Sequence, residues 1–257
     1  MMGDLHSRRP LEDERHYRRG LYLLPTIFTV GNMFCGYACV VFAMRGELST
    51  AAPFIGVAVV LDMLDGRIAR MTKTSSAFGL QLDSLADIIS FGIAPAVLAF
   101  AWGLSDLGRV GWAAGFLYLT AAAMRLARFN IQTTGQVDKR FFVGMPSPPA
   151  AGVVAATIFA WPVPPPGLAQ PAAAIALVLV PAALMVSTMR FRSFKTINLG
   201  WTQSYVQILI VAGLIAAIAT APDIALVVFA YGYLLSAFIE EGLTRYRLRR
   251  SGPPAPG

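Results

Sequence analysis

Long apolar runs alternate with short polar stretches along most of the chain. An α-helix needs about 20 apolar residues to cross the hydrocarbon core of a bilayer, and most of the runs approach this length. Closed β-barrels span membranes with short segments of alternating polarity, which these continuous runs do not resemble. The pattern predicts an all-α, polytopic membrane bundle with about eight transmembrane helices. The predicted helices cover residues 21–44, 49–71, 79–103, 109–131, 147–163, 168–188, 203–220 and 222–243.

The polar ends of the chain divide it into three parts. The first twenty residues are polar and are therefore not a cleavable signal peptide, so residues 1–20 are predicted to form an N-terminal arm. Residues 21–244 form the membrane domain that carries the candidate chemistry. Residues 245–257 are basic and then rich in proline and glycine, which predicts a disordered C-terminal tail.

Basic residues predict how the bundle is oriented. The chain has 21 Lys and Arg residues and a formal net charge of +7. With eight spans, only Arg45 and Arg109 flank the side opposite the termini, and cytoplasmic flanks carry the excess of basic residues. We therefore expect both termini, and the active site near them, on the cytoplasmic side of the cell (inner) membrane. Topology and attraction to anionic lipids account for the net charge, so no nucleic-acid partner is expected.

Four aspartates interrupt the apolar pattern in the stretch LDMLDGRIARMTKTSSAFGLQLDSLADIIS, residues 61–90. Asp62 and Asp65 are three residues apart and Asp83 and Asp87 four apart, so each pair projects from one helix face. An ionised carboxylate inside a bilayer costs about 2.5 to 3.5 kcal/mol even on the lenient insertion scale. Several oxygen ligands at one depth suit Mg²⁺ or Mn²⁺. The sequence predicts a site for such ions, with two of them balancing four charges.

The residues between the two pairs suit a phosphate-bearing ligand. Gly66 and Gly79 leave the carboxylate faces free of side-chain bulk, and Arg70 can neutralise a phosphate. Thr72 and Lys73 begin a polar loop that would close the pocket. Each residue also has a structural explanation, because glycines pack helices, cytoplasmic flanks are basic, and hydroxyls cap helices. The four carboxylates favour the functional interpretation.

The spacing D-x2-D-G-x2-A-R-x8-G-x3-D-x3-D resembles the signature of the CDP-alcohol phosphotransferase family. Members are integral membrane enzymes with a six-helix core, commonly homodimers, that transfer a phosphatidyl or similar group from a CDP-linked donor to an alcohol and release CMP. The resemblance implies that the aspartates hold divalent metal and that Asp87 is also the catalytic base. It further implies a CDP-donor site formed by Asp62, Gly66, Ala69, Arg70, Thr72, Lys73 and Gly79. The signature positions are Asp62, Asp65, Gly66, Ala69, Arg70, Gly79, Asp83 and Asp87.

Further segments resemble the integral membrane phosphatidylserine synthase branch of this family. They include LPTIFTVGNMFCGY at 24–37, RLARFN at 125–130 and FFVGMPSPPAAG at 141–152. This resemblance implies CDP-diacylglycerol as donor and L-serine as acceptor. Serine carries a carboxylate, so its pocket needs a cation. The candidate acceptor residues are Arg125, Arg128, Asn130 and Ser147.

Other interpretations stay open. The same arginines would suit glycerol phosphate or inositol phosphate, choline is a further possible acceptor, and a metal or ion transporter can also bury aspartates beside broken helices. A phospholipase-D-like route to phosphatidylserine would need paired H-x-K elements. The two histidines, His6 and His16, are not followed by x-Lys. A metal-dependent direct displacement is therefore the mechanism expected for the enzyme.

Overall fold

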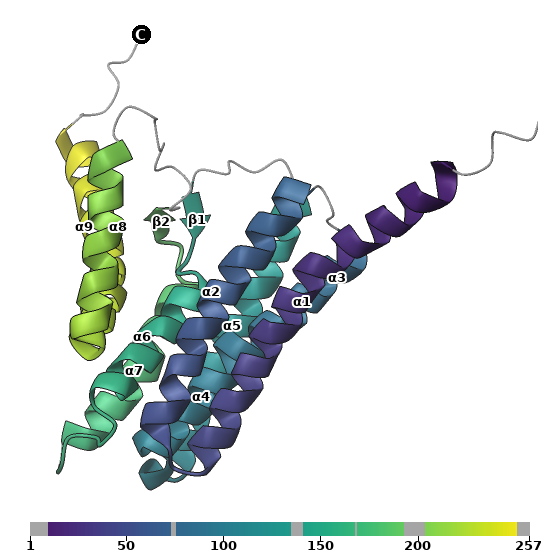
Figure 1. Ribbon diagram of the computed structural model, residues 1–257. Helices are drawn as coiled ribbons and strands as arrows, with labels where there is room; N and C mark the ends of the chain where they lie inside the picture. The colour runs from purple at the N-terminus through teal and green to yellow at the C-terminus, as the bar shows by residue number, and fades with distance from the viewer. Residues whose placement is uncertain (1–9, 73–75, 135–140, 168, 193–203, 251–257) are drawn as a thin grey trace, which may run out of the picture.

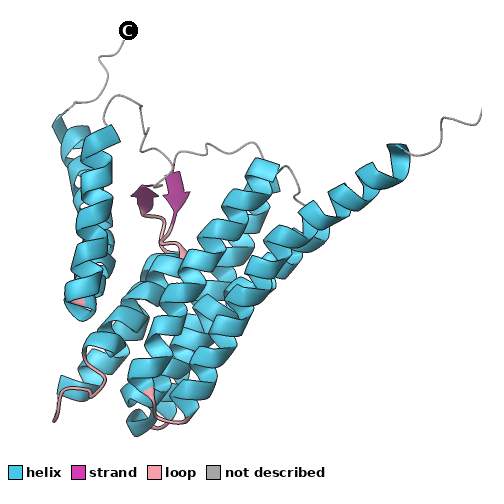
Figure 2. Ribbon diagram, viewed as in Figure 1, coloured by secondary structure: helices cyan, strands magenta, loops and turns pink. Residues whose placement is uncertain are grey.

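The computed structural model describes residues 10–72, 76–134, 141–167, 169–192 and 204–250, and within these ranges the chain is almost entirely helical (Figures 1 and 2). Residues 77–107 form one irregular helical rod made of α, π and 3₁₀ segments. In chain order the elements are α1 (Pro10–Met44), α2 (Leu48–Thr72), α3 (Ala77–Asp87), η1 (Ile88–Ile93), α4 (Ala94–Ala99), η2 (Phe100–Leu104), η3 (Ser105–Leu107), α5 (Arg109–Thr134), β1 (Phe141–Val143), α6 (Ser147–Ala160), α7 (Ala169–Val186), β2 (Arg190–Arg192), α8 (Ser204–Thr220) and α9 (Pro222–Arg250).

Each apolar run that the sequence analysis singled out forms a helix, which confirms the all-α membrane bundle. Helix α1 begins at Pro10, inside the predicted arm, and α9 continues to Arg250, inside the predicted tail. Division into arm, domain and tail stays a prediction, as does the count of eight spans. Within the described residues, five helices are long and apolar enough to cross a membrane, at Pro25–Met44, Leu48–Met71, Ala77–Leu107, Arg109–Ile131 and Ala169–Val186.

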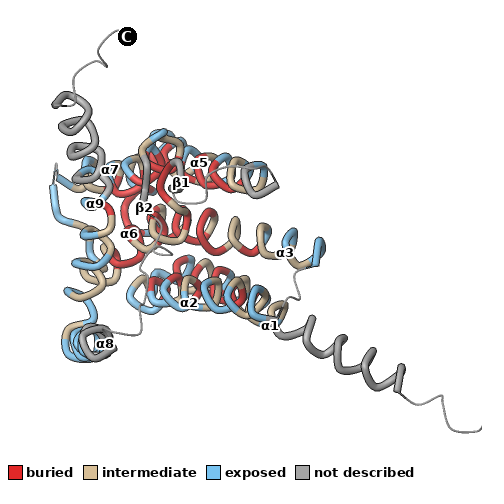
Figure 3. The backbone as a smooth tube through the Cα atoms, turned by 90° about the horizontal axis from the view of Figure 1, so that it is seen from above, coloured by how far each residue is buried: buried red, intermediate tan, exposed pale blue. Residues whose placement is uncertain are grey.

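Seen from above, the helices form three rows (Figure 3). Helices α1 and α2 make one row, the rod from α3 to α4 and helix α6 make the middle row, and α5 and α7 make the third. The middle row carries much of the buried surface. Buried side chains there include Phe91, Leu98 and Val154, each 0% exposed. The rod bearing Asp83 and Asp87 is therefore held from both sides.

A close contact joins α1 to the π-helical turn η1. The Ser90 hydroxyl donates a hydrogen bond of 2.9 Å to the main-chain oxygen of Asn32. Gly36 makes this approach possible, because a Cβ at that position would lie 2.6 Å from the Ser90 hydroxyl oxygen and 2.8 Å from its Cα. The π-helical turn begins directly after Asp87, and π-bulges in helices are frequent at functional sites. The contact thus fixes the rod against α1 just beyond the last aspartate.

A short antiparallel ladder departs from the all-α expectation. Strands β1 and β2 pair over three residues each, with Phe142 opposite Phe191. Beyond the ladder, the Met145 amide donates to the Leu184 main-chain oxygen at 2.9 Å. Gly144 has φ +85°, and a Cβ there would collide with the Met185 main-chain oxygen. These bonds tie the start of α6 to the end of α7.

The last two helices form a hairpin at one side of the bundle (Figure 1). Helix α9 packs along α6, and α8 packs on α9. Leu234 of α9 is buried, and the hydroxyl groups of Tyr231 and Thr157 lie 2.9 Å apart across the α6–α9 contact. The hairpin is therefore docked on the bundle through α9.

The α1–η1 contact yields a prediction about stability. In Gly36→Ala the added methyl group must push the Ser90 backbone away, and such overpacking costs about 1–3 kcal/mol. We expect a lower thermal midpoint in detergent. The matched control is Gly56→Ala in α2, where a Cβ meets nothing within 4 Å. The control should be neutral or slightly stabilising, because alanine favours a helix over glycine by about 0.5–1 kcal/mol. Equal midpoints for the two variants would show that the α1–η1 contact is not a close-packed one.

Candidate functional site

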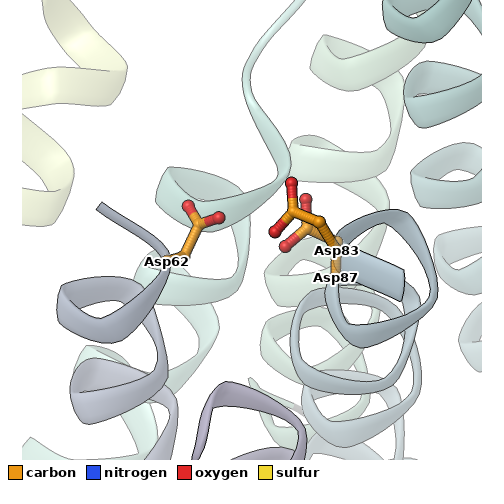
Figure 4. A group of neighbouring side chains, drawn as sticks. All are labelled: Asp62, Asp83 and Asp87. Carbon is orange, nitrogen blue, oxygen red and sulfur yellow. The ribbon is translucent and has the colours of Figure 1, made fainter. Parts of the chain in front are cut away.

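Three carboxylates converge where α2 faces the α3 rod. Asp62 comes from α2, and Asp83 and Asp87 come from successive turns of α3 (Figure 4). One carboxylate oxygen of each lies within 4.8 Å of the others. The Oδ1 atoms of Asp83 and Asp87 are buried and have no hydrogen-bond partner among the described residues. The structure therefore brings together side chains that are up to 25 residues apart in sequence.

This arrangement fits a divalent cation. Burial removes the carboxylates from water, and their mutual repulsion adds to the cost of ionising them. A cation between the oxygens would offset both costs and would use the two orphaned Oδ1 atoms as ligands. Oxygen donors of this kind suit the hard ions Mg²⁺ and Mn²⁺. The acidic group can therefore hold a metal ion.

Asp65 lies beside this group but faces α1. Its side chain is 4% exposed, and it accepts a hydrogen bond of 3.1 Å from the Thr29 hydroxyl. Thr29 lies equally close to the main-chain oxygen of Pro25, four residues earlier in α1. Repulsion from Asp62 and Asp83 still reaches Asp65. Asp65 therefore belongs to the same electrostatic cluster, and α1 orients it.

The predicted donor-site residues surround the carboxylates along α2 and α3. Among the described residues, a Cβ added at Gly66 would meet just the Arg70 guanidinium, at 3.9 Å. Arg70 is exposed in the last turn of α2, and Ala69 is half-buried. Gly79 lies in the first turn of α3, and its amide donates a hydrogen bond of 2.9 Å to the hydroxyl of the N-cap residue Ser76. The Thr72 side chain and all of Lys73 lie outside the described residues.

Arg125 is the predicted acceptor residue that the structure brings to the carboxylates. It projects from α5, is 9% exposed, and is attracted electrostatically to Asp87 and Asp62. Its guanidinium lies over the Phe129 ring, 5.3 Å from the centroid. A buried cation next to acids and against an aromatic face is held in place by both. Arg125 thus forms one border of the acidic group.

The other predicted acceptor residues have different surroundings. Arg128 donates to the Val186 main-chain oxygen at 3.4 Å, at the end of α7. Asn130 donates to the Ser84 hydroxyl at 3.0 Å and so links α5 to the residue after Asp83. Ser147, in the first turn of α6, is 4% exposed, and its hydroxyl has no partner among the described residues. The structure gives Arg128 and Asn130 bonds between helices, and their roles in acceptor binding stay predictions.

Two buried polar side chains near the site carry unused hydrogen-bonding capacity. One is Ser147, on α6, which packs against both α2 and η1. The other is Asn32, 0% exposed, whose amide nitrogen and oxygen both lack a partner within the described chain. Asn32 lies one turn beyond Thr29 on α1. Buried polar groups usually find a partner in proteins, a water or ligand included, so both positions suit a polar, ligand-binding environment.

Comparison with known proteins agrees with this geometry. The family model for CDP-alcohol phosphatidyltransferases matches residues 22–189. The chain belongs to the CDP-alcohol phosphatidyltransferase family. The matched region runs from α1 to the residue before β2, so it contains all four aspartates, Arg125 and Ser147. Helices α8 and α9 lie beyond it.

Several relatives of this family share sequence with part of the chain. A protein of Helicobacter pylori strain ATCC 700392 / 26695 is 42% identical over 134 residues, covering 52% of this chain and 56% of the relative. One of Mycobacterium leprae is 42% identical over 135 residues (51% and 45%), and one of Saccharomyces cerevisiae is 38% identical over 158 residues (55% and 56%). Each is named CDP-diacylglycerol–serine O-phosphatidyltransferase. The chain thus spans about half the length of these relatives.

Sequence analysis missed Thr29 as a partner of Asp65. The residue lies within the LPTIFTVGNMFCGY segment, but threonine is common in membrane helices and nothing in the spacing connects it with an aspartate 36 positions later. The signal that could have found it is its helical position. Thr29 follows Pro25 by four residues, and Asp65 needs a donor from a neighbouring helix once it is buried.

We predict that Thr29→Val weakens metal binding without disturbing the fold. Loss of a residue that orients a metal ligand typically costs about 10 to 100-fold in affinity. The measurement is the Mn²⁺ concentration needed to raise the thermal midpoint of the substrate-free protein, and we expect an increase of about tenfold. Thr120→Val is the matched control, because its hydroxyl bonds to the Phe116 main-chain oxygen within α5. If both variants require the same Mn²⁺ concentration, Thr29 does not orient a metal ligand.

Proposed function

We propose that this protein transfers the phosphatidyl group of CDP-diacylglycerol to L-serine, giving phosphatidylserine and CMP. The observation that carries the proposal is the convergence of Asp62, Asp83 and Asp87 inside the family's signature. The names of the relatives support serine as the acceptor. Buried Arg125 supports an acceptor that bears an anionic group. Glycerol phosphate and inositol phosphate would satisfy the same cation, so the acceptor must be tested directly.

The metal would be Mg²⁺ or Mn²⁺, with two ions held by Asp62, Asp65, Asp83 and Asp87. When bound, it would supply positive charge to the diphosphate of the donor. Asp65 would join the ligand set through its Oδ1 atom, while the Thr29 hydroxyl holds Oδ2. The open face at Gly66 leaves room for the nucleotide, and exposed Arg70 suits the donor's phosphates. Ala69, Gly79, Thr72 and Lys73 complete the proposed donor site.

Different residues of the chain would carry out different steps of the reaction. Asp87 accepts the proton of the serine hydroxyl on a carboxylate oxygen. The serine oxygen then forms a bond to the lipid-side phosphorus, and the bond from that phosphorus to the CMP oxygen breaks. Arg125 holds the serine carboxylate, with Arg128, Asn130 and Ser147 as further acceptor contacts. Burial beside α1 and α6 keeps bulk water away from the phosphorus.

The proposal includes an orientation and an assembly. Excess Lys and Arg on the termini's side of the bundle supports a cytoplasmic active site and cytoplasmic termini in the cell membrane. There the enzyme would take its lipid substrate from the membrane and release its lipid product into the same membrane. A homodimer is proposed from the resemblance to the family alone. Labelling of single introduced cysteines by an impermeant reagent in cells and in inside-out vesicles tests the orientation.

An acceptor panel tests the function. Purified protein in detergent is freed of metal with EDTA and mixed with CDP-diacylglycerol, restored Mg²⁺ or Mn²⁺, and either serine, glycerol 3-phosphate, inositol, inositol phosphate or choline. We expect CMP release with serine, dependent on the metal, and a lipid product with the mass of phosphatidylserine. A lipid product from another alcohol would show that serine is not the acceptor, while the type of reaction would stand. If no alcohol in the panel led to CMP release, the proposed enzymatic function would be wrong and a transporter would be favoured.

We predict that Asp87→Asn separates donor binding from turnover. Asparagine keeps the shape and removes the basicity, and a general base typically contributes about 10² to 10⁴-fold in rate. The variant should still be stabilised thermally by CDP-diacylglycerol with Mg²⁺, while serine-dependent CMP release falls by about that factor. Asp62→Asn, Asp65→Asn and Asp83→Asn should lose both activity and metal-dependent stabilisation.

Asp106→Asn is the matched control for these variants, since Asp106 is exposed at the other end of the bundle and accepts a hydrogen bond from Gln170. It should keep normal activity. If Asp87→Asn loses donor binding as fully as Asp62→Asn, Asp87 serves mainly as a metal ligand. Normal turnover by Asp87→Asn would overturn the proposed mechanism.

A further inference from the structure

Asn32 of α1 is a buried polar side chain to which the proposed reaction gives no role. It is 0% exposed, and neither its amide nitrogen nor its amide oxygen has a hydrogen-bond partner among the described residues. Burial of a polar group without a partner destabilises a fold, so buried amides are nearly always bonded. An asparagine that joins membrane helices does so through a bond across them, and this side chain makes none within the described chain. The amide therefore suits a partner that comes from outside the protein.

Three residues of α1 form a stripe that faces the inside of the bundle. Thr29, Asn32 and Gly36 follow one another at intervals of three and four residues, which places them on one side of the helix. The first donates to Asp65 of α2. The last approaches Ser90 of η1, where an added Cβ would lie 2.6 Å from the hydroxyl oxygen. Because Asn32 lies between these two contacts, its side chain is directed toward the junction of α2 with the rod.

The register of α1 against α2 fixes the depth of Asn32. The two helices run antiparallel (Figure 1), and the hydroxyl–carboxylate bond described above joins them. Asn32 comes three residues after the donor of that bond, and Asp62 comes three residues before its acceptor, so the two lie level. A second contact agrees, because a Cβ at Gly31 would lie 3.3 Å from the side chain of Leu61. Asn32 therefore borders the acidic group at the depth of Asp62.

The proposed donor site lies on the other side of that depth. Gly66 and Arg70 come one and two turns after Asp62 on α2, and Arg70 is exposed in the last turn of the helix. Asn32 is thus further from the helix end than the groups proposed to bind the nucleotide and its phosphates. Its chemistry also separates it from them, because a metal ion would use just the amide oxygen and a phosphate just the amide N–H groups.

An α-amino acid offers a partner for both atoms of the amide. It carries an ammonium, which donates, and a carboxylate, which accepts, on the same carbon. We propose that Asn32 recognises the amino group of the acceptor: Oδ1 accepts a hydrogen bond from the serine ammonium, and Nδ2 donates to a carboxylate oxygen. Arg125, on α5 at another border of the acidic group, binds the same carboxylate.

This assignment, which rests on the proposed function, explains how the site would select its acceptor. Arg125 by itself suits any acceptor with an anionic group, including glycerol phosphate and inositol phosphate. A second cation there would repel Arg125, whereas an ammonium needs an acceptor that is not already bound to metal. Asn32 is a neutral side chain with such an oxygen. It would therefore distinguish serine from the two phosphate-bearing alcohols.

Two analogues that divide serine into its halves test the inference. 3-Hydroxypropionate keeps the hydroxyl and the carboxylate and lacks the amino group, and ethanolamine keeps the hydroxyl and the amino group and lacks the carboxylate. CMP release from CDP-diacylglycerol with Mg²⁺ is measured for serine and for each analogue, and the mass of the lipid product is checked. Where an analogue does not turn over, its inhibition of the serine reaction gives the same comparison.

The variants separate the two proposed contacts. Asn32→Leu keeps a branched side chain without polar atoms, Asn32→Ala removes the amide without crowding its neighbours, and Arg125→Lys keeps the charge and loses the planar fork. Two measurements that need no turnover accompany the kinetics. One is thermal stabilisation by serine in the presence of CDP and Mg²⁺, and the other is the Mn²⁺ concentration that raises the thermal midpoint of the substrate-free protein.

We expect both Asn32 variants to lower kcat/KM for serine and ethanolamine by about 10 to 100-fold, the range of a hydrogen bond to a charged group, and that for 3-hydroxypropionate by less than about threefold. Stabilisation by serine should weaken in parallel, while the Mn²⁺ requirement stays unchanged. Arg125→Lys should instead spare ethanolamine. The ligand-free midpoint of Asn32→Leu should not fall, because the amide makes no bond to the described residues in that state.

Equal losses for serine and 3-hydroxypropionate in the Asn32 variants would overturn the inference, as would a wild-type protein that uses these two acceptors alike. So would a rise in the Mn²⁺ requirement as large as that expected for Thr29→Val, since Asn32 would then act through the metal ligands. In each of these cases wild-type turnover of serine leaves the proposed function standing. A wild-type protein that uses another alcohol of the panel and not serine would overturn the proposed acceptor and this inference together.

Discussion

Mutual repulsion among four neighbouring carboxylates, that of Asp65 buried and the other three half-buried, is the constraint around which this bundle is organised. Each carboxylate costs about 2.5 to 3.5 kcal/mol at the centre of a membrane helix, and repulsion between neighbours adds to that. Such a cluster persists when opposite charge lies close to it. Arg125, 9% exposed, supplies one positive charge from within the chain. The negative charge that Arg125 does not balance favours the binding of cations from solution. A metal site can be built among apolar helices in this way.

The scaffold meets this constraint by fixing the helices that carry the acids. Helix α1 contributes twice, through the Thr29 hydroxyl on Asp65 and through the close approach of Gly36 to Ser90 beyond Asp87. The ladder of β1 and β2 holds the start of α6 where Ser147 is buried. Rigid elements position ligating groups more accurately than loops do. The carboxylates therefore repel one another without separating the helices that bear them.

Much of this arrangement could be predicted from the sequence, because its signals are local. Continuous apolar runs indicate membrane helices, and the spacing of Asp83 and Asp87 places them on one face. Three residues on a helix correspond to a rotation of about 300°, so Asp65 is offset from Asp62 by about 60° and turns toward α1. The spacing rule that joined them on one face could not show this offset. The orientation of Asp65 depends on its hydrogen bond with Thr29 of α1, 36 positions earlier in the chain.

Other features depend on contacts that the sequence does not encode nearby. The three-residue strands are too short to show an alternating pattern, and their pairing joins segments about 50 positions apart. Tyr231 meets Thr157 from 74 positions later in the chain, in an apolar helix where a tyrosine suits any membrane interface. The π-helical turn at 88–93 has no distinctive composition, and it coincides with the place where Ser90 meets α1 at Gly36.

That π-helical turn makes the number of residues between Asp87 and Pro95 matter as well as their identity, and Ser90 and Phe91 there are both 0% exposed. A π turn accommodates one residue more than an α turn. Removal of a single residue from 88–93 would let the rod continue as a regular α-helix with its backbone hydrogen bonds intact. Since the wide turn takes up one residue within itself, the helices on either side of it would keep their relative rotation, and what would be lost is the wide turn that brings Ser90 to α1. The extra residue thus serves the contact between the rod and α1, the helix that also orients Asp65.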